Sequence, residues 1–261
     1  MGHPPSPLPN EVKGTIESLK TPAHLIFMHH PQASLTEIQL LDNPIWSALT
    51  TEQAYLAQGN TLARRFPRDV APFAAMSDHS PAAFQALADI LAGDPAPLSL
   101  DASSVLPDGW AVLFNLEAYQ MVFDGPTPPK PKHAIRKLTH EDVPEMLALT
   151  KLTEPGPFLP RTIELGTYLG IHDAGSLVAM AGERLHLTGF TEVSAVCTHP
   201  DFTGRGYGAA LVSAVMAGIL DRGETPFLHM KAGNPAIGLY QKLGFKVRAQ
   251  MHLAAIKYVP A

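Results

Sequence analysis

Cysteine is nearly missing from this sequence, because Cys197 is the single one among 261 residues. One thiol cannot form an intrachain disulfide, and such sparse use of cysteine fits a reducing compartment. Its neighbours in the sequence are apolar or β-branched, which favours a small buried side chain over a reactive nucleophile. A secreted fold held together by disulfides is therefore excluded.

Long apolar runs and an excess of positive charge are missing as well. No run approaches the about 18 apolar residues that cross a bilayer, and no charged-then-apolar leader opens the sequence. There are 19 lysines and arginines against 24 aspartates and glutamates, and the formal charge of −5 argues against a general nucleic-acid binder. We therefore expect a cytoplasmic protein without membrane or nucleic-acid partners.

Apolar residues and proline are present in quantity. The hydrophobic fraction of 46% suits a packed core, and 261 residues accommodate one large domain or two modest ones. Prolines crowd positions 126–131, and proline lacks the amide donor that the interior of a helix or sheet needs. We expect a linker over 125–133, with an α+β domain at 20–124 before it and a second domain at 134–261 after it. Residues 1–19 are expected to form a flexible tail.

The N-terminal half mixes helix and strand signals. Ser34 and Glu37 form a capping-box pair ahead of apolar positions at helical spacing, and a second helix is expected over 81–91. Residues 70–76 and 110–123 have the composition of strands, the latter of one strand or of two. This mixed order favours an α+β half.

Two polar groups in this half have functional alternatives. His29 and His30 are adjacent, so they do not share a helix face, and no acidic or cysteine ligand stands at a recognised spacing. We therefore expect no metal site there. The densest basic cluster of this half consists of Arg64, Arg65 and Arg68. We interpret it as part of a solvated loop, with contact to an anionic ligand as the alternative.

The second half predicts an alternation of strands and helices. Thr139 is placed to cap a helix from His140 to about Leu149, and the proline-rich residues 155–160 predict an irregular loop. Strands are expected over residues 134–138, 166–172, 176–184 and 190–198.

The strongest signal is the stretch 193–220, in which an apolar strand leads through a glycine-rich turn into a helix. Gly204, Gly206 and Gly208 allow the main chain to approach a ligand, and the free amides and positive dipole end of the helix face it. The pattern predicts an anion site suited to phosphate, with a purely structural turn as the alternative. Neither the lysine of a P-loop nor the glycine spacing of a dinucleotide fingerprint is present.

The turn Thr203-Gly204-Arg205-Gly206-Tyr207-Gly208 resembles the acetyl-coenzyme A loop of the GCN5-related N-acetyltransferase (GNAT) superfamily, which reads Gln/Arg-x-x-Gly-x-Gly/Ala. Thr203 departs from that pattern, since the family usually has Gln or Arg there. A second motif over 234–245 resembles the closing helix of the family, and residues 244–251 are most similar to its FR47-like branch. The resemblance covers about 134–258.

The resemblance implies a fold and an activity. The fold would be α+β, with a mixed, mostly antiparallel sheet flanked by helices and a smaller N-terminal domain similar to a degenerate acetyltransferase lobe. The activity would be transfer of an acetyl group from acetyl-CoA to a primary amine of a small molecule or peptide. The amine would attack directly in a ternary complex, without a metal. Many relatives form dimers, so the resemblance also allows a homodimer.

The resemblance further implies which residues hold the coenzyme. Main-chain groups of the strand at Val196 and Thr198 would pair with the pantetheine arm, and Asn234 would contact its amide or cap the following helix. The Arg205 side chain would meet a phosphate. Main-chain amides that would receive the diphosphate belong to Gly204, Arg205, Gly206, Tyr207, Gly208 and Ala209.

Two catalytic roles complete what the resemblance implies. Tyr240 matches the tyrosine that donates a proton to the coenzyme sulfur, and a phenol is protonated at neutral pH; ordinary packing on its helix is the alternative. Glu192 stands where several relatives have a general base, and a solvated strand-end glutamate is the alternative. Glu183, or waters beyond His199, rank lower as bases.

A second functional hypothesis comes from another class of protein. A chain with this fold could bind an acyl-coenzyme A as a scaffold without turnover, and a missing productive base would be its signature. The sequence does not specify the amine acceptor, because the fold alone does not determine it.

Overall fold

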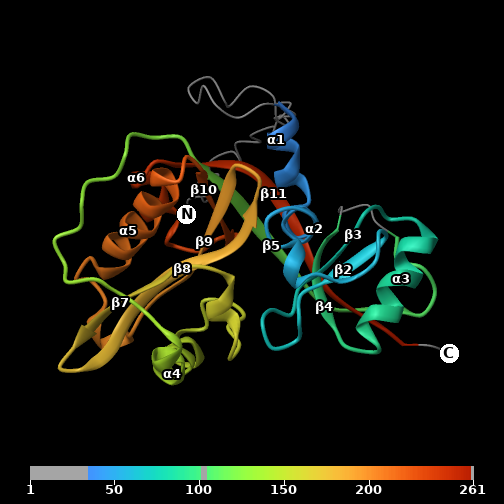
Figure 1. Cartoon of the computed structure of the whole chain (residues 1–261), viewed down its shortest axis with the longest axis horizontal. Helices are drawn as coiled ribbons and strands as arrows, with labels where there is room; N and C mark the ends of the chain where they lie inside the picture. The colour runs from blue at the N-terminus through green and yellow to red at the C-terminus, as the bar shows by residue number, and fades with distance from the viewer. Residues whose placement is uncertain (1–34, 101–104, 260–261) are drawn as a thin grey trace, which may run out of the picture.

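The computed structural model describes residues 35–100 and 105–259, and its main feature is an eight-stranded sheet (Figure 1). The strand order is β4-β11-β5-β10-β9-β8-β7-β6, and a separate three-stranded sheet has the order β1-β2-β3. Most neighbouring strands are antiparallel, whereas β9 and β10 are parallel. This mixed sheet with its flanking helices confirms the predicted fold class. The tail expected over 1–19 and the pair His29 and His30 lie outside the described residues.

The N-terminal half is an α+β arrangement of short elements. Its helix from residue 81 begins as predicted, because the Ser80 hydroxyl oxygen accepts the Ala83 N–H and Pro81 occupies the first helical position. The strand expected over 70–76 is shorter than predicted. The elements are α1 (Leu35–Gln39), α2 (Pro44–Thr50), β1 (Gln58–Gly59), β2 (Ala63–Arg65), β3 (Ala74–Met76), α3 (Pro81–Leu91) and β4 (Ala96–Leu100).

Strand β5 (Trp110–Phe123) is one continuous strand that joins the two halves of the chain. It pairs with β11 (Phe245–Tyr258) along its length and with β10 (Thr225–Lys231) at its C-terminal end. The sheet therefore includes strands from both sides of the linker expected at 125–133. The division into two domains stays a prediction, but β5 belongs to the same sheet as the second half.

The second half follows the predicted alternation with shifted boundaries. The first strand is only two residues long, and the helix after Thr139 opens with a 3₁₀ turn and runs past Leu149. The elements are β6 (Arg136–Lys137), α4 (Val143–Thr153), β7 (Tyr168–Asp173), β8 (Ser176–Leu187), β9 (Phe190–Thr198), α5 (Tyr207–Asp221) and α6 (Ile237–Lys242).

The two faces of the large sheet are covered by different parts of the chain. On one face, Met216 and Ile219 of α5 belong to the core cluster that contains Val193 of β9 and Leu228 of β10. On the other face, α2 packs over Phe190 and Phe227, and α4 covers the β7–β8 end (Figure 1). Each large apolar side chain buried in this way contributes about 1.5–3 kcal/mol. In the part of the chain that the structure describes, no helix has the length and apolarity required to cross a membrane.

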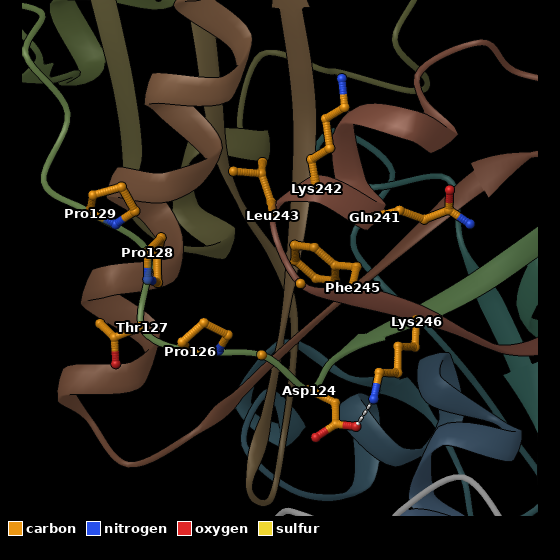
Figure 2. Close-up of a pocket in the computed structure, with 12 residues that line it drawn as sticks. Asp124, Pro126, Thr127, Pro128, Pro129, Gln241, Lys242, Leu243, Phe245 and Lys246 are labelled. Atoms are coloured by element: carbon orange, nitrogen blue, oxygen red, sulfur yellow. Dashed lines mark hydrogen bonds and ion pairs between the residues drawn. The ribbon is translucent and has the colours of Figure 1, made fainter.

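The proline-rich segment after β5 lies along the side of the molecule that carries α5 and α6 (Figure 1). It starts at the ion pair between Asp124 and Lys246, whose Nζ lies 2.6 Å from the carboxylate oxygen. Residues 124–129 and 241–246 line a cavity of about 360 Å³ between the segment and the end of α6 (Figure 2). Further along, the His133 ring meets Tyr207 edge-on, at 5.1 Å between centroids.

Candidate active site

Strands β9 and β10 separate from each other in the middle of the sheet. Their parallel pairing covers only residues 190–192 of β9 and 225–227 of β10, after which β9 continues with β8 and β10 with β5. Ala195 has a φ of 50°, an unusual value for alanine in a strand, and it lies where the β8–β9 register shifts between Ser194 and Cys197. The register shifts a second time between Thr191 and Val193. The bulge at Ala195 bends β9 away and leaves part of its main chain facing the gap.

Beyond the bulge, β9 leads into the glycine loop that the sequence predicts to be an anion site. Gly204 and Gly206 have φ values of 76° and 78°, in the left-handed region, and Gly206 is the N-cap of α5. A Cβ added at Gly204 would meet no atom within 4 Å, and both glycines are exposed. No side chain among the described residues caps α5. The first amides of this 15-residue helix therefore point outward without an intrahelical partner.

The other residues expected to hold the coenzyme lie around this loop. Val196 and Thr198 are half-buried on β9 past the bulge, and the Thr198 hydroxyl lies 4.0 Å from a Cβ position at Gly208. The Arg205 guanidinium is exposed and stacks 4.6 Å over the Phe202 ring. Asn234 follows β10, and its side-chain oxygen accepts the N–H of Ala236, the N-cap residue of α6, in the turn before the helix.

Tyr240 lies in the middle of α6 and packs against the same core cluster as α5. Its ring meets Phe245 at a centroid distance of 6.1 Å and an angle of 82°. Burial raises the pKa of the Tyr240 phenol to about 12, so the hydroxyl keeps its proton at neutral pH. This geometry is compatible with proton donation and with plain packing.

Glu192 is the last β9 residue that pairs with β10, and its carboxylate is fully buried. Arg184 of β8 donates to both oxygens at 2.8 and 2.6 Å, and His229 Nδ1 lies 2.7 Å from Oε1. Burial alone would raise the pKa of Glu192, but the Arg184 charge and these hydrogen bonds outweigh it and hold the pKa at about 2. The alternative of a solvated strand-end glutamate is therefore wrong. A carboxylate held in this way is a weak proton acceptor.

The lower-ranked bases are also engaged. The Glu183 carboxylate is buried and accepts from both terminal nitrogens of Arg222 at 3.1 Å. His199 lies at the corner after β9, where Nδ1 accepts the Asp201 N–H at 3.2 Å. Cys197 is buried, as predicted, and burial raises the pKa of its thiol to about 11.

Sequence reasoning missed several polar side chains near Glu192. Arg184, His229, Gln120 and Tyr168 come from four different strands, and the Tyr168 hydroxyl is buried with no hydrogen-bond partner among the described residues. The available signal was a polar residue between apolar neighbours in a buried strand, as with His229 between Leu228 and Met230. Within the described ranges, no group of three or more His, Cys, Asp or Glu is placed to hold a metal.

The fold and the site together have the features of the GNAT fold, in which two parallel strands diverge and a glycine loop follows the first of them. Residues 168–253 match the family model described as FR47-like protein. A GNAT-family protein from Novosphingobium aromaticivorans is 38% identical, with a TM-score of 0.78, over 84% of this chain and 99% of its own. The chain belongs to the GCN5-related N-acetyltransferase superfamily.

More distant structures share the fold. A GCN5-related N-acetyltransferase from Kribbella flavida has a TM-score of 0.57 at 18% identity, over 83% of this chain and 94% of its own. A conserved protein of unknown function from Staphylococcus epidermidis has a TM-score of 0.51 at 11% identity, over 82% and 99%. No curated protein matches the sequence.

Proposed function

We propose that the protein transfers an acetyl group from acetyl-CoA to a primary amine by direct attack in a ternary complex. The observation that carries this proposal is the divergence of β9 and β10 at Glu192, followed by the open loop at Gly204 and Gly206. Membership of the family supports acetyl transfer as the reaction class.

The residues present fit the coenzyme. Left-handed glycines without side chains leave the amides of residues 204–209 open to a diphosphate, and Arg205 adds a cation at the rim. The main chain at Val196 and Thr198, which lies past the β9–β10 pairing, would bind the pantetheine arm, with Asn234 near its amide. When bound, acetyl-CoA would supply an activated thioester carbonyl.

The remaining chemistry is proton transfer. Tyr240 would donate its phenolic proton to the departing thiolate, a role that its raised pKa permits at neutral pH. Both Glu192 oxygens accept hydrogen bonds from Arg184, and Oε1 also contacts His229. Glu192 would therefore assist proton transfer through a neighbouring side chain and would not itself be the base. The acceptor would be a small-molecule or peptide amine, and the composition supports a cytoplasmic location, with a homodimer left open.

The occupied Glu192 carboxylate also favours a second candidate function. A protein that binds acyl-CoA without turnover needs no free general base. A glutamate whose carboxylate is fully hydrogen-bonded, as Glu192 is, would be the expected signature of such a scaffold.

One experiment separates the two functions. Acetyl-CoA is titrated into the protein by calorimetry, and thiol release is followed with peptide, polyamine, amino-acid and aminoglycoside amines. We expect binding and thiol release with at least one amine class. Binding without release across the panel would favour the scaffold, and no heat of binding would contradict both.

A further inference from the structure

A row of polar side chains crosses five adjacent strands at the point where β9 and β10 separate. Each strand from β11 to β8 contributes one member, in the order Arg248, Gln120, His229, Glu192 and Arg184. Adjacent members contact one another at 2.8 Å (Arg248 to Gln120), 3.1 Å (Gln120 to His229), 2.7 Å (His229 to Glu192) and 2.6 Å (Arg184 to Glu192). A polar group in a buried strand needs a hydrogen-bond partner, and each member of the row supplies one to its neighbour.

The row fixes the protonation state of the histidine. The Gln120 carbonyl oxygen accepts from Arg248, so the amide nitrogen of Gln120 faces His229 Nε2 and also donates to the Leu41 carbonyl at 2.8 Å. An amide nitrogen can only donate, so His229 Nε2 must accept and has no proton. His229 Nδ1 then donates to Glu192. The imidazole is therefore neutral, with its lone pair on Nε2.

His229 also lies just past the point where β10 stops pairing with β9. It follows Phe227, the last β10 residue paired with β9, by two positions, and the two rings meet edge-on at 5.6 Å on the face opposite α5. Glu192 is fully buried, whereas the His229 side chain is 11% exposed. The histidine is thus the more accessible end of the carboxylate–imidazole pair.

We propose that His229 Nε2 takes the proton from the acceptor amine and that Glu192 is the positioning residue that orients the ring and stabilises the imidazolium. This inference rests on the proposed acetyl transfer. The amine nitrogen bonds to the thioester carbon as the carbon–sulfur bond breaks, the N–H proton passes to Nε2, and the thiolate takes the proton of Tyr240. The imidazolium proton then returns to the phenolate through water. The Nε2 lone pair becomes available because the second N–H of Gln120 has another acceptor, Met251 Sδ, at 3.5 Å.

The two arginines of the row are each paired with a carboxylate. Arg184 from β8 lies behind Glu192, and Arg248 from β11 lies behind Gln120 and is paired with Asp42. Each cation is matched by an anion, so the row has no net charge with a neutral imidazole. Protonated His229 would add one positive charge directly beside the carboxylate.

The test compares two histidine variants on different strands of the same sheet, β10 and β11. His229→Gln should lower kcat/KM by about 10²–10⁴-fold and abolish the acid limb of its pH profile. Acetyl-CoA affinity should change by less than about twofold. The matched control His252→Gln removes a half-exposed ring near Glu117, far along β11, and should leave activity unchanged.

A measurement on the unaltered protein guards against a misfolded variant. Nitrogen-15 NMR should find His229 as the Nδ1–H tautomer at pH values above the acid limb of kcat/KM, with Nε2 protonation following that limb. An unchanged limb in a folded His229→Gln variant, or an Nε2–H tautomer, would overturn the assignment of His229 alone. Failure of the unaltered enzyme to release thiol with any amine would overturn the proposed function as well.

Discussion

Glu192 and Arg184 form a buried ion pair that contributes to folding stability, apart from any role in acetyl transfer. Their side chains are 0% and 15% exposed, so removing one partner leaves a buried charge uncompensated. We expect Glu192→Gln to lower the free energy of unfolding by about 3–5 kcal/mol in urea titrations. Arg161→Gln, which breaks half-exposed pairs with Asp69 and Glu164, is the control and should cost less than about 1 kcal/mol. Equal losses of unfolding free energy in the two variants would contradict the stabilising role of the buried pair.

The same carboxylate makes stability depend on acid pH. Its pKa falls from the ordinary 4.5 to about 2 in the folded protein, so the folded state binds its proton less readily than the unfolded state. The stabilisation is fully present above pH 4.5 and is lost as the pH falls towards 2. Urea midpoints measured between pH 5 and 3 should fall more steeply for the unaltered protein than for Glu192→Gln; parallel curves would show that another group is responsible.

Tyr240 gives the second residue-scale prediction. Tyr240→Phe keeps the ring that packs on Phe245 but removes the proton donor, so kcat should fall by about 10²-fold while acetyl-CoA affinity stays within twofold. Tyr55→Phe, at an exposed position, serves as the control. If kcat and affinity fall together for Tyr240→Phe, the residue is structural.

At this scale the sequence revealed some residues and not others. The glycines at 204 and 206 could be recognised because a local pattern of strand, turn and helix surrounds them. The partners of Glu192 could not, because Arg184 and His229 come from β8 and β10, which lie on either side of β9 only in the assembled sheet. Tertiary pairing of this kind leaves no mark at a fixed sequence spacing.

Among the elements, the loop and α5 act as one unit. Gly206→Ala places a side chain at a φ of 78°, which costs about 1 kcal/mol, and it should weaken acetyl-CoA binding by shifting the amides. Gly218→Ala is the matched control, because this glycine lies inside α5 with open space around its Cβ position and no positive φ. That change should stabilise α5 by roughly 0.5–1 kcal/mol without changing affinity. Calorimetry measures the acetyl-CoA affinity of both variants, and thermal melts measure their stability. Equal acetyl-CoA affinities would contradict the role of Gly206 in the loop.

Element identity was predictable wherever a local signal marked it. The helix at 81–91 has its serine cap and proline, and the helix before Gly223 has a glycine stop. Strand lengths were less predictable: β6 is confined to two residues because only these pair with β7. The bulge at Ala195 had no signal, since alanine rarely adopts a positive φ.

The large sheet depends on β5, although the proline-rich segment separates this strand from the second half in the sequence. Since β5 lies between β10 and β11, a fragment of residues 134–261 would expose the inner edges of both strands. We expect this fragment to lack a cooperative thermal transition. The 261-residue protein cleaved within 127–132 should keep both pieces together in size-exclusion chromatography. A cooperatively folded fragment would contradict the shared sheet and favour independent domains.

The pairing of β5 with β11 could not be predicted from the sequence. The prolines at 126–131 correctly predict irregular structure, yet they do not show that residues 110–123 pair with residues 245–258. Segments more than 100 positions apart meet only through the topology of the complete sheet.

The most direct test is a crystal structure of the protein with acetyl-CoA. Our account predicts the diphosphate on the amides of residues 204–209, the thioester between β9 and β10, and the sulfur within hydrogen-bond reach of the Tyr240 hydroxyl. Coenzyme bound elsewhere, for example in the cavity lined by residues 124–129 and 241–246, would contradict it.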